Sequence, residues 1–146
     1  MNNFEVGRLI GRLEVVFRGC DIEKEIEMLE DAFKYEDDIR NIARIYGRLE
    51  QKMIIANKSK KDILELRKLF EEVENKCIEL YLDKDIKDLN LIGLPVKKLN
   101  EAGIYTIRDL SNKTYNKLLE INGISEITLK RILDKLRFNC VVLKKN

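Results

Sequence analysis

The chain has no histidine and no tryptophan, and its 146 residues include one proline, seven glycines and three cysteines. Without histidine, the commonest general base and a frequent zinc ligand are both missing. The cysteines Cys20, Cys77 and Cys140 lie far apart and outside any Cys-x-x-Cys pair, which favours three reduced thiols that serve in packing. No Walker pattern and no nucleophile elbow occurs. We therefore expect no catalytic residue, no metal site, no cofactor and no enzymatic activity.

Long apolar runs are missing as well. No stretch of about 18 apolar residues is present, so we expect no membrane-spanning helix. The N-terminal segment MNNFEVGRLIGRLE carries charged residues within its apolar run, unlike the core of a secretory signal peptide. These absences predict a cytoplasmic protein with no membrane partner.

The composition that remains is typical of an all-α protein. Hydrophobic residues make up 45% of the chain and charged residues 37%, which suffices for a core beneath a highly charged surface. Few glycines and a single proline favour helices with short connections. Residues 1–84 carry 16 basic and 19 acidic side chains, a net charge of −3, whereas residues 85–146 carry 12 and 7, a net charge of +5. The basic C-terminal part fits a nucleic-acid partner.

Residues 1–84 show the 3.6-residue periodicity of amphipathic helices in successive segments, which predicts a bundle of three to four helices. Gly19 is expected to end the first helix, and Asp21 to cap the second. Asp37 or Asp38 is expected to cap the third helix, and Ser59 with Asp62 forms a capping signature before the fourth. The apolar stripes comprise Phe4, Val6, Leu9, Ile10, Leu13, Val16 and Phe17, then Ile22, Ile26, Leu29 and Phe33, then Ile39, Ile42, Tyr46, Leu49 and Met53, and finally Ile63, Leu66, Leu69, Phe70, Val73, Cys77 and Leu80.

An internal similarity links two of these segments. GRLIGRLE at 7–14 and ARIYGRLE at 43–50 share five of eight residues. Each places small residues four positions apart, Gly7 with Gly11 and Ala43 with Gly47. Glycine in a helix interior costs roughly 1 kcal/mol, so one hypothesis is close pairing of helices, within the chain or across a homodimer of the N-terminal helices. The alternative is coincidence between two amphipathic helices.

The polar segment DKDIKD at 83–88 marks the expected boundary between a domain at 1–84 and a domain at 85–146. Beyond it the elements become short. A helix beginning near Pro95 is expected to end near Ala102, with Gly103 as its left-handed cap, and Thr114 is expected to cap the next helix, YNKLLEI.

The stretch NGISEITLKRIL from Asn122 to Leu133 then predicts a helix-hairpin-helix. Gly123 permits a tight turn, Ile124 enters the core, and Ser125 caps a helix bearing Ile127, Leu129, Ile132, Leu133 and Leu136. The first N–H groups of a helix have no partner within it and can hold a phosphate. The alternative is that the hairpin only joins two helices and Ser125 only caps. The candidate nucleic-acid-binding residues are Lys97, Lys98, Gly123, Ser125, Thr128 and Arg131.

Residues 86–143 resemble the C-terminal domain of the bacterial RNA polymerase alpha subunit. The matching stretches are DLNLIGLPVKKLNEAGIYTIRDL and TYNKLLEINGISEITLKRILDKL. They share the paired Leu118–Leu119 and an apolar set comprising Leu99, Ile104, Ile107, Leu110, Leu129 and Ile132. The resemblance implies a small helical domain that contacts the minor groove of DNA and transcription factors. Residues 1–84 do not resemble the large N-terminal domain of that subunit.

This sequence departs from the family at the DNA-contacting positions. The main arginine of the family falls at Leu94 and a neighbouring asparagine at Lys97. In the hairpin a glycine becomes Ser125 and a lysine becomes Ile127, while the hydroxyl position is kept as Thr128. Leucine cannot enter a narrow minor groove as a cation does. Lys97 and Lys98 would instead contact phosphates, which position a protein without specifying sequence.

Two functions follow as hypotheses. The first is a small transcription-associated protein that binds double-stranded DNA weakly through the C-terminal domain, while the N-terminal helices dimerise or dock a partner. The second is a protein–protein adaptor, for example within the transcription machinery, that keeps the alpha-like fold without binding DNA.

Overall fold

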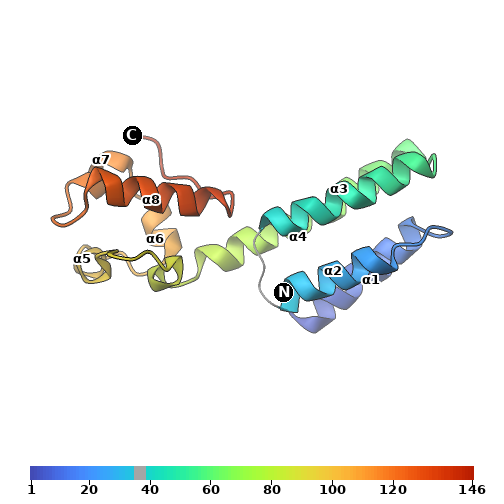
Figure 1. The fold of residues 1–146 in the computed structure, drawn as a ribbon, viewed down its shortest axis with the longest axis horizontal. Helices are drawn as coiled ribbons and strands as arrows, with labels where there is room; N and C mark the ends of the chain where they lie inside the picture. Colours follow the sequence, from blue (N-terminus) through green and yellow to red (C-terminus); the bar gives the residue numbers. More distant parts are fainter. Residues whose placement is uncertain (35–38) are drawn as a thin grey trace. The chain divides into compact units, whose positions relative to one another are not determined.

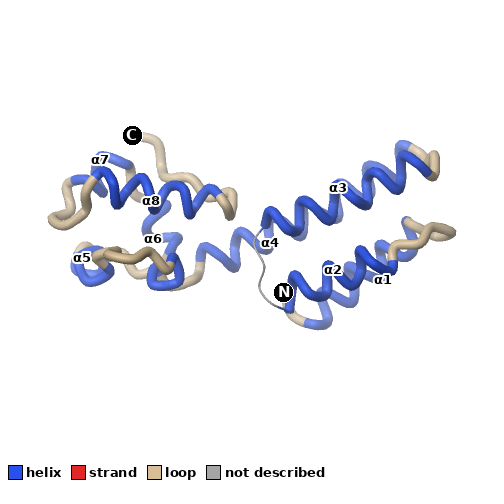
Figure 2. The backbone as a smooth tube through the Cα atoms, in the orientation of Figure 1, coloured by secondary structure: helices blue, strands red, loops and turns tan. Residues whose placement is uncertain are grey.

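The computed structural model describes residues 1–34 and 39–146, which contain eight α-helices and one short 3-10 helix (Figure 1). Figure 2 shows these helices joined by loops, with no strand in the described residues. Two isolated bridges occur, antiparallel between Asp85 and Thr106 and parallel between Thr114 and Lys144. The all-α prediction is therefore confirmed. No helix in the described part of the chain has both the length and the apolar character needed to cross a membrane.

The chain divides into two compact units, residues 1–77 and 78–146. The first unit contains α1 (Asn3–Val16), α2 (Glu23–Lys34), α3 (Ile39–Ile55) and most of α4 (Lys60–Leu82). The end of α4 belongs to the second unit, followed by the 3-10 helix η1 (Ile86–Leu89), α5 (Val96–Glu101), α6 (Ile107–Ser111), α7 (Tyr115–Leu119) and α8 (Glu126–Arg137).

The first unit is a four-helix bundle around one core. Each helix contributes a leucine that is fully shielded from solvent, namely Leu13, Leu29, Leu49 and Leu66. Along the chain, α1 packs on α2 and α2 on α3. Arg12 of α1 forms ion pairs with Glu65 and Glu72 of α4, both at 3.2 Å, which join the first helix of the bundle to the fourth. The bundle expected from the apolar periodicity is thus present.

The helix ends in this unit follow local rules. Gly19 lies just after the end of α1 and has φ +84°, a left-handed conformation that favours glycine and does not continue a helix. The Asp21 side chain accepts a 3.1 Å hydrogen bond from the Glu23 amide, and Ser59 Oγ accepts one of 3.2 Å from the Asp62 amide. The capping expected of Asp37 or Asp38 lies outside the described residues.

Two residues assigned to the apolar stripes are in fact exposed. Phe4 retains 73% of its accessible surface and Leu80 46%. Nine residues, or two and a half turns, separate Phe4 from the buried Leu13, which puts them on opposite faces of α1. The assignment of Phe4 to the core stripe was wrong because its position does not fit the helical spacing of the buried Leu9 and Leu13.

The small residues of the repeated segment also face outward. A Cβ atom built on Gly7, Gly11 or Gly47 would meet no neighbouring atom within 4 Å, and Ala43 is exposed. No helix among the described residues approaches these glycines closely. Close pairing within the chain is therefore wrong, and pairing across a dimer stays a prediction.

One carboxylate is buried in the bundle. Glu25 of α2 has no accessible surface and pairs with Lys52 Nζ at 2.8 Å and Arg48 Nη2 at 3.4 Å, both from α3. Burial acts to raise the pKa of Glu25, but the hydrogen bond and charge of Lys52 and the charge of Arg48 outweigh it, so the pKa is lowered. Lys52 also donates to the carbonyl oxygen of Asp21 at 2.6 Å, which joins this pair to the turn before α2.

The second unit has its own core, and Figure 1 shows its short helices α5 to α7 beside the longer α8. Leu99, Ile104, Ile107, Leu110, Leu129 and Ile132, the apolar positions of the resemblance, have no accessible surface. Pro95 immediately precedes α5, and Gly103 after it has φ +80°. Thr114 caps α7 through a 3.2 Å hydrogen bond from the Lys117 amide.

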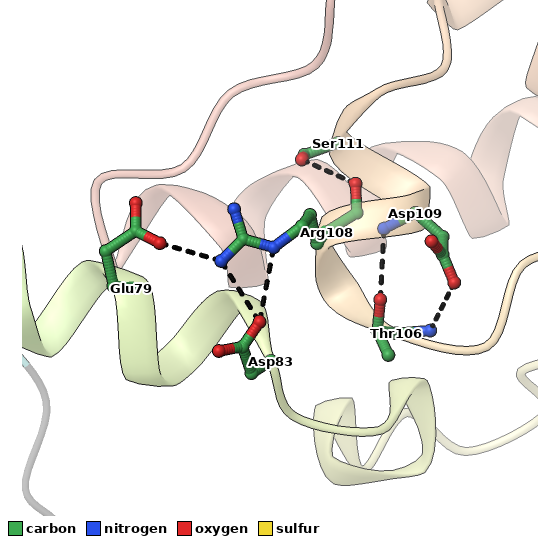
Figure 3. Close-up of polar contacts among 6 residues, drawn as sticks. All are labelled: Glu79, Asp83, Thr106, Arg108, Asp109 and Ser111. Atoms are coloured by element: carbon green, nitrogen blue, oxygen red, sulfur yellow. Dashed lines mark hydrogen bonds and ion pairs between the residues drawn. The ribbon is translucent and has the colours of Figure 1, made fainter.

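The segment at 83–88 is held against α6 and the residues before it. Arg108 of α6 points toward Glu79 and Asp83 (Figure 3), donating to their carboxylates at 2.7 and 3.0 Å from Nη2. The Ile86 amide donates to the Tyr105 carbonyl at 3.0 Å, and the Ile86 side chain is fully buried. These contacts fix the end of α4 and η1 as parts of the second unit.

The N-terminus of α6 is closed by a reciprocal cap, also visible in Figure 3. The Thr106 side chain accepts from the Asp109 amide at 3.1 Å, and the Asp109 carboxylate accepts from the Thr106 amide at 3.1 Å. Hydrogen bonds from the Tyr105 and Thr106 amides lower the pKa of Asp109.

Candidate nucleic-acid interface

The turn between α7 and α8 has the geometry of a helix-hairpin-helix. Gly123 has φ +96°, a left-handed conformation in which a Cβ atom is strained. Ile124 follows with 6% of its surface exposed and packs into the core of the second unit. The turn is thus anchored by Ile124, while Asn122, Gly123 and Ser125 around it remain exposed.

Ser125 occupies the cap of α8 in extended conformation. Its Oγ accepts a 3.1 Å hydrogen bond from the Thr128 amide and lies 3.0 Å from Thr128 Oγ1. The amides of Glu126 and Ile127 come before the first intrahelical bond and donate to no other described residue. These two amides, the two hydroxyls and the positive end of the helix form a site suited to an anion.

Lys98 of α5 lies against this turn. A Cβ atom built on Gly123 would lie 3.4 Å from Lys98 Cγ. The Lys98 ammonium is 3.5 Å from the Glu101 carboxylate, in an exposed pair of the kind that contributes little to stability. Lys97, its neighbour on α5, is exposed and pairs with no acidic group in the described part of the chain.

Arg131 takes a different position from the one expected. Its Nη1 atom donates a 3.0 Å hydrogen bond to the carbonyl oxygen of Ile92, in the loop before α5. Arg131 therefore joins α8 to that loop. Of the six candidate residues, Lys98 lies against Gly123, and Ser125 is hydrogen-bonded to Thr128. No hydrogen bond or ion pair among the described residues joins Lys97 or Arg131 to these four.

Exposed apolar side chains next to this site were not foreseen. Ile127, expected in the core of α8, retains 75% of its surface, and Ile92 retains 87%. Ile127 lies two residues before the buried Leu129, a rotation of about 200° around the helix, so it faces away from the core. This two-residue spacing was the sequence signal that could have identified Ile127 as exposed. Leu94, at the family's arginine position, is half-buried.

The charges around the turn are of both signs. Lys97, Lys98 and Lys130 are exposed, but so is Glu126 at the first position of α8. Glu126 suits the positive end of the helix and opposes the approach of a phosphate. The local field therefore attracts an anion only modestly.

The acidic and cysteine side chains were also compared with the requirements of a metal site or a reactive thiol. No group of three or more cysteine or acidic side chains in the described ranges is arranged to hold a metal ion. Cys20 and Cys77 are half-buried, and burial raises the pKa of the Cys77 thiol. Cys140 is exposed, contrary to the packing role expected of it.

Comparison with known proteins bears on residues 96–137, which match the family described as a SAM-like helix-hairpin-helix tandem. The chain is also similar to the DNA-directed RNA polymerase subunit alpha of Mesoplasma florum, at 33% identity over an alignment of 85 residues. That alignment covers 53% of this chain and 27% of the relative, so the chain spans only about a quarter of that protein. No solved structure matches the chain significantly. Residues 96–137 therefore match a helix-hairpin-helix family, and the C-terminal half is similar to part of an RNA polymerase alpha subunit.

Proposed function

We propose that this protein is a transcription-associated factor whose C-terminal domain binds the backbone of double-stranded DNA through the turn between α7 and α8. The observation that carries the proposal is the open N-terminus of α8. There the amides of Glu126 and Ile127 lie in the same helix turn as the hydrogen-bonded hydroxyls of Ser125 and Thr128, and Lys98 lies beside Gly123 in the preceding turn. The role is binding and not catalysis.

In this arrangement one phosphate would accept hydrogen bonds from the α8 amides and from a hydroxyl. Lys98 would leave its exposed partner Glu101 for the phosphate, at little cost. Lys97 would reach the next phosphate along the strand. Contacts of this kind position a protein on DNA and carry no sequence information by themselves.

The similarity to an RNA polymerase alpha subunit supports a role in transcription. The half-buried Leu94, where the family has its main arginine, removes a cation from the interface. We therefore expect weak binding that depends strongly on salt.

A homodimer formed by the N-terminal bundle would compensate for weak binding, because two linked sites gain effective concentration. Phe4 and Val15 of α1 expose 73% and 64% of their surfaces, and the glycine face between them has room for a second helix. Light scattering of the full chain tests this: a dimer that Val15→Asp converts to a monomer is expected. A wild-type chain that stays monomeric at high concentration contradicts dimerisation.

The DNA proposal is tested by titrating a labelled duplex with the full chain at a series of salt concentrations. Affinity is expected to fall steeply as salt rises, and Lys98→Gln is expected to reduce the slope of log affinity against log salt by about one. Lys24→Gln is the matched control, because it removes an exposed lysine from α2. Absence of binding at low salt, or a response that is flat with salt, contradicts the proposal.

A further inference from the structure

We infer that one end of the N-terminal bundle binds the surface of an anionic lipid bilayer. This end, the bundle tip, comprises residues 15–24 around the α1–α2 turn and residues 54–64 around the α3–α4 turn. Apolar side chains of the tip would enter the boundary between headgroups and acyl chains, while its lysines contact the headgroups. The inference goes beyond the proposed function and does not depend on it.

Exposed apolar side chains gather at the bundle tip. The first unit exposes five large apolar residues in its described part, and four of them belong to the tip, namely Val15, Ile54, Ile55 and Leu64. Ile55, the last residue of α3, retains 82% of its accessible surface, and the other three retain 53–64%. Singly scattered apolar residues are normal on a protein surface, whereas a concentration of them indicates a contact surface.

Two contacts place the turns of the tip together. Lys58 Nζ, in the α3–α4 turn, donates a 3.0 Å hydrogen bond to the carbonyl oxygen of Arg18, just after α1. Val15 and Lys61 line the same groove between α1 and α4, which has a volume of about 550 Å³. Figure 1 shows both turns at the same end of the bundle. The exposed apolar residues therefore surround a single end, to which α1, α3 and α4 all contribute.

The charge of the tip favours an anionic surface. Residues 54–64 contain three lysines and one aspartate, a net charge of +2, whereas residues 15–24 contain two basic and two acidic residues, a net charge of 0. Lys60 and Lys61 are exposed, and neither pairs with an acidic group in the described part of the chain. Each lysine close to an anionic bilayer strengthens binding about fivefold. The α3–α4 turn therefore supplies most of the attraction.

The α3–α4 turn is also closed by its own backbone. Ala56, Asn57 and Lys58 donate their amides to carbonyl oxygens at the end of α3, at 3.0–3.1 Å. Backbone amides are costly to remove from water when they are unpaired, but these three are already paired within the protein. The turn can therefore enter the headgroup region without losing these hydrogen bonds.

This arrangement fits a bilayer better than DNA or a protein helix. DNA phosphates offer no apolar surface to isoleucine, and an amphipathic helix binds through one stripe of anchors, whereas the exposed residues of the tip lie on three helices. A bilayer accepts apolar side chains on every side of an inserted end, beside lysines that reach the headgroups. The missing long apolar run, from which we predicted no membrane partner, does not exclude this contact, because surface binding needs no spanning segment.

The apolar part of the tip is tested by sedimenting the full chain at low salt with vesicles of phosphatidylglycerol or of phosphatidylcholine. We expect strong binding to the anionic vesicles only. The variant carrying Ile54→Ser and Ile55→Ser should bind them about tenfold more weakly. The matched control carries Ile92→Ser and Ile127→Ser, which alter two isoleucines of the second unit that are 87% and 75% exposed, and should bind like wild type. Val15 is unchanged in both variants, so dimerisation through α1 is not affected.

The charged part of the tip is tested in the same assay. The variant carrying Lys60→Gln and Lys61→Gln should lose at least tenfold in affinity for phosphatidylglycerol vesicles at low salt. Lys144→Gln with Lys145→Gln is the matched control, because it removes two adjacent exposed lysines from the second unit. An equal loss in the control would show that the net charge of the chain, and not the tip, attracts the vesicles, and would overturn the inference.

A fluorescent residue can report insertion directly. The chain contains no tryptophan, so a single introduced tryptophan reports on one position. The emission of an Ile55→Trp variant should shift to shorter wavelength when phosphatidylglycerol vesicles are added, because the indole leaves water. An Ile92→Trp variant should show no shift. Equal shifts for the two variants, or none for Ile55→Trp, contradict insertion of the tip.

The remaining outcomes separate this inference from the proposed function. Absence of binding to phosphatidylglycerol vesicles by wild type, or binding that survives both substitutions of the tip, overturns the inference, and the exposed residues would then form a protein-docking surface. The variant carrying Ile54→Ser and Ile55→Ser should bind DNA like wild type, which also verifies its fold. Absence of DNA binding by wild type contradicts the proposed function alone.

Discussion

The side chain of Lys98 lies directly over Gly123, close enough that a methyl group on the glycine would come within 3.4 Å of Lys98 Cγ. The φ angle of Gly123 is +96°, so an added Cβ would also strain the backbone. We expect Gly123→Ala to destabilise the protein by about 1–2 kcal/mol, because of the positive φ angle, and to weaken DNA binding by changing the conformation of the turn. Chemical unfolding and DNA titration measure the two effects.

Gly11→Ala is the control for this prediction. Gly11 lies within α1 and faces open space, so an alanine there should stabilise the protein by about 0.5–1 kcal/mol. Equal effects of the two substitutions on stability would contradict the strain assigned to Gly123.

Ser125 is expected both to cap α8 and to contact DNA. Thr114, which caps only α7, allows these two roles to be measured separately. Ser125→Ala and Thr114→Ala each remove a cap with a similar hydrogen bond, of 3.1 and 3.2 Å, and should each cost about 1 kcal/mol of stability. Only Ser125→Ala should weaken DNA binding, because Thr114 caps α7. If the two variants bind DNA equally well, Ser125 acts as a cap alone.

Glu126 limits the affinity of the proposed interface. Replacing Glu126 by glutamine removes a negative charge from the N-terminus of α8, next to the proposed anion site. DNA affinity should rise about threefold at low salt. Glu23→Gln is the matched control, since Glu23 is also exposed at the first position of a helix, α2. Unchanged affinity for Glu126→Gln would place the DNA away from the end of α8.

Much of the fold could be predicted because its determinants are local. Gly19, Ser59 and Thr114 mark helix ends through backbone angles or side-chain caps that involve only neighbouring residues. The apolar positions of the C-terminal core, such as Leu99 and Ile132, follow helical spacing and are fully buried. Local chemistry of this kind can be read directly from the order of the residues.

The errors have two different causes. Phe4 and Ile127 are apolar and occur in amphipathic segments, yet each lies on the outer face of its helix. Their spacing from the buried Leu13 and Leu129 was enough to place them there, whereas other contacts depend on residues far apart in the sequence. The contact of Arg131 with Ile92 joins residues 39 positions apart, and no local signal predicts it.

The buried Glu25 was foreseeable, since it follows Ile22 by three residues and precedes Leu29 by four, on the apolar face of α2. Its pKa is lower in the folded protein than in the unfolded chain because of Lys52 and Arg48, even though burial opposes this. The ionised carboxylate therefore stabilises the fold above the ordinary pKa of glutamate. This stabilisation is lost as the pH falls through the lowered pKa.

The pH dependence of a Glu25→Gln variant tests this ion pair. Near neutral pH the variant should be less stable than wild type by about 1–2 kcal/mol, since the glutamine keeps a hydrogen bond but loses the charge. The difference should shrink as the pH is lowered below the ordinary range for glutamate, where wild type loses the same charge. Glu27→Gln, an exposed change on the same helix, should show no such trend. A stability difference for Glu25→Gln that is constant with pH would show that the carboxylate contributes through packing and not through its charge.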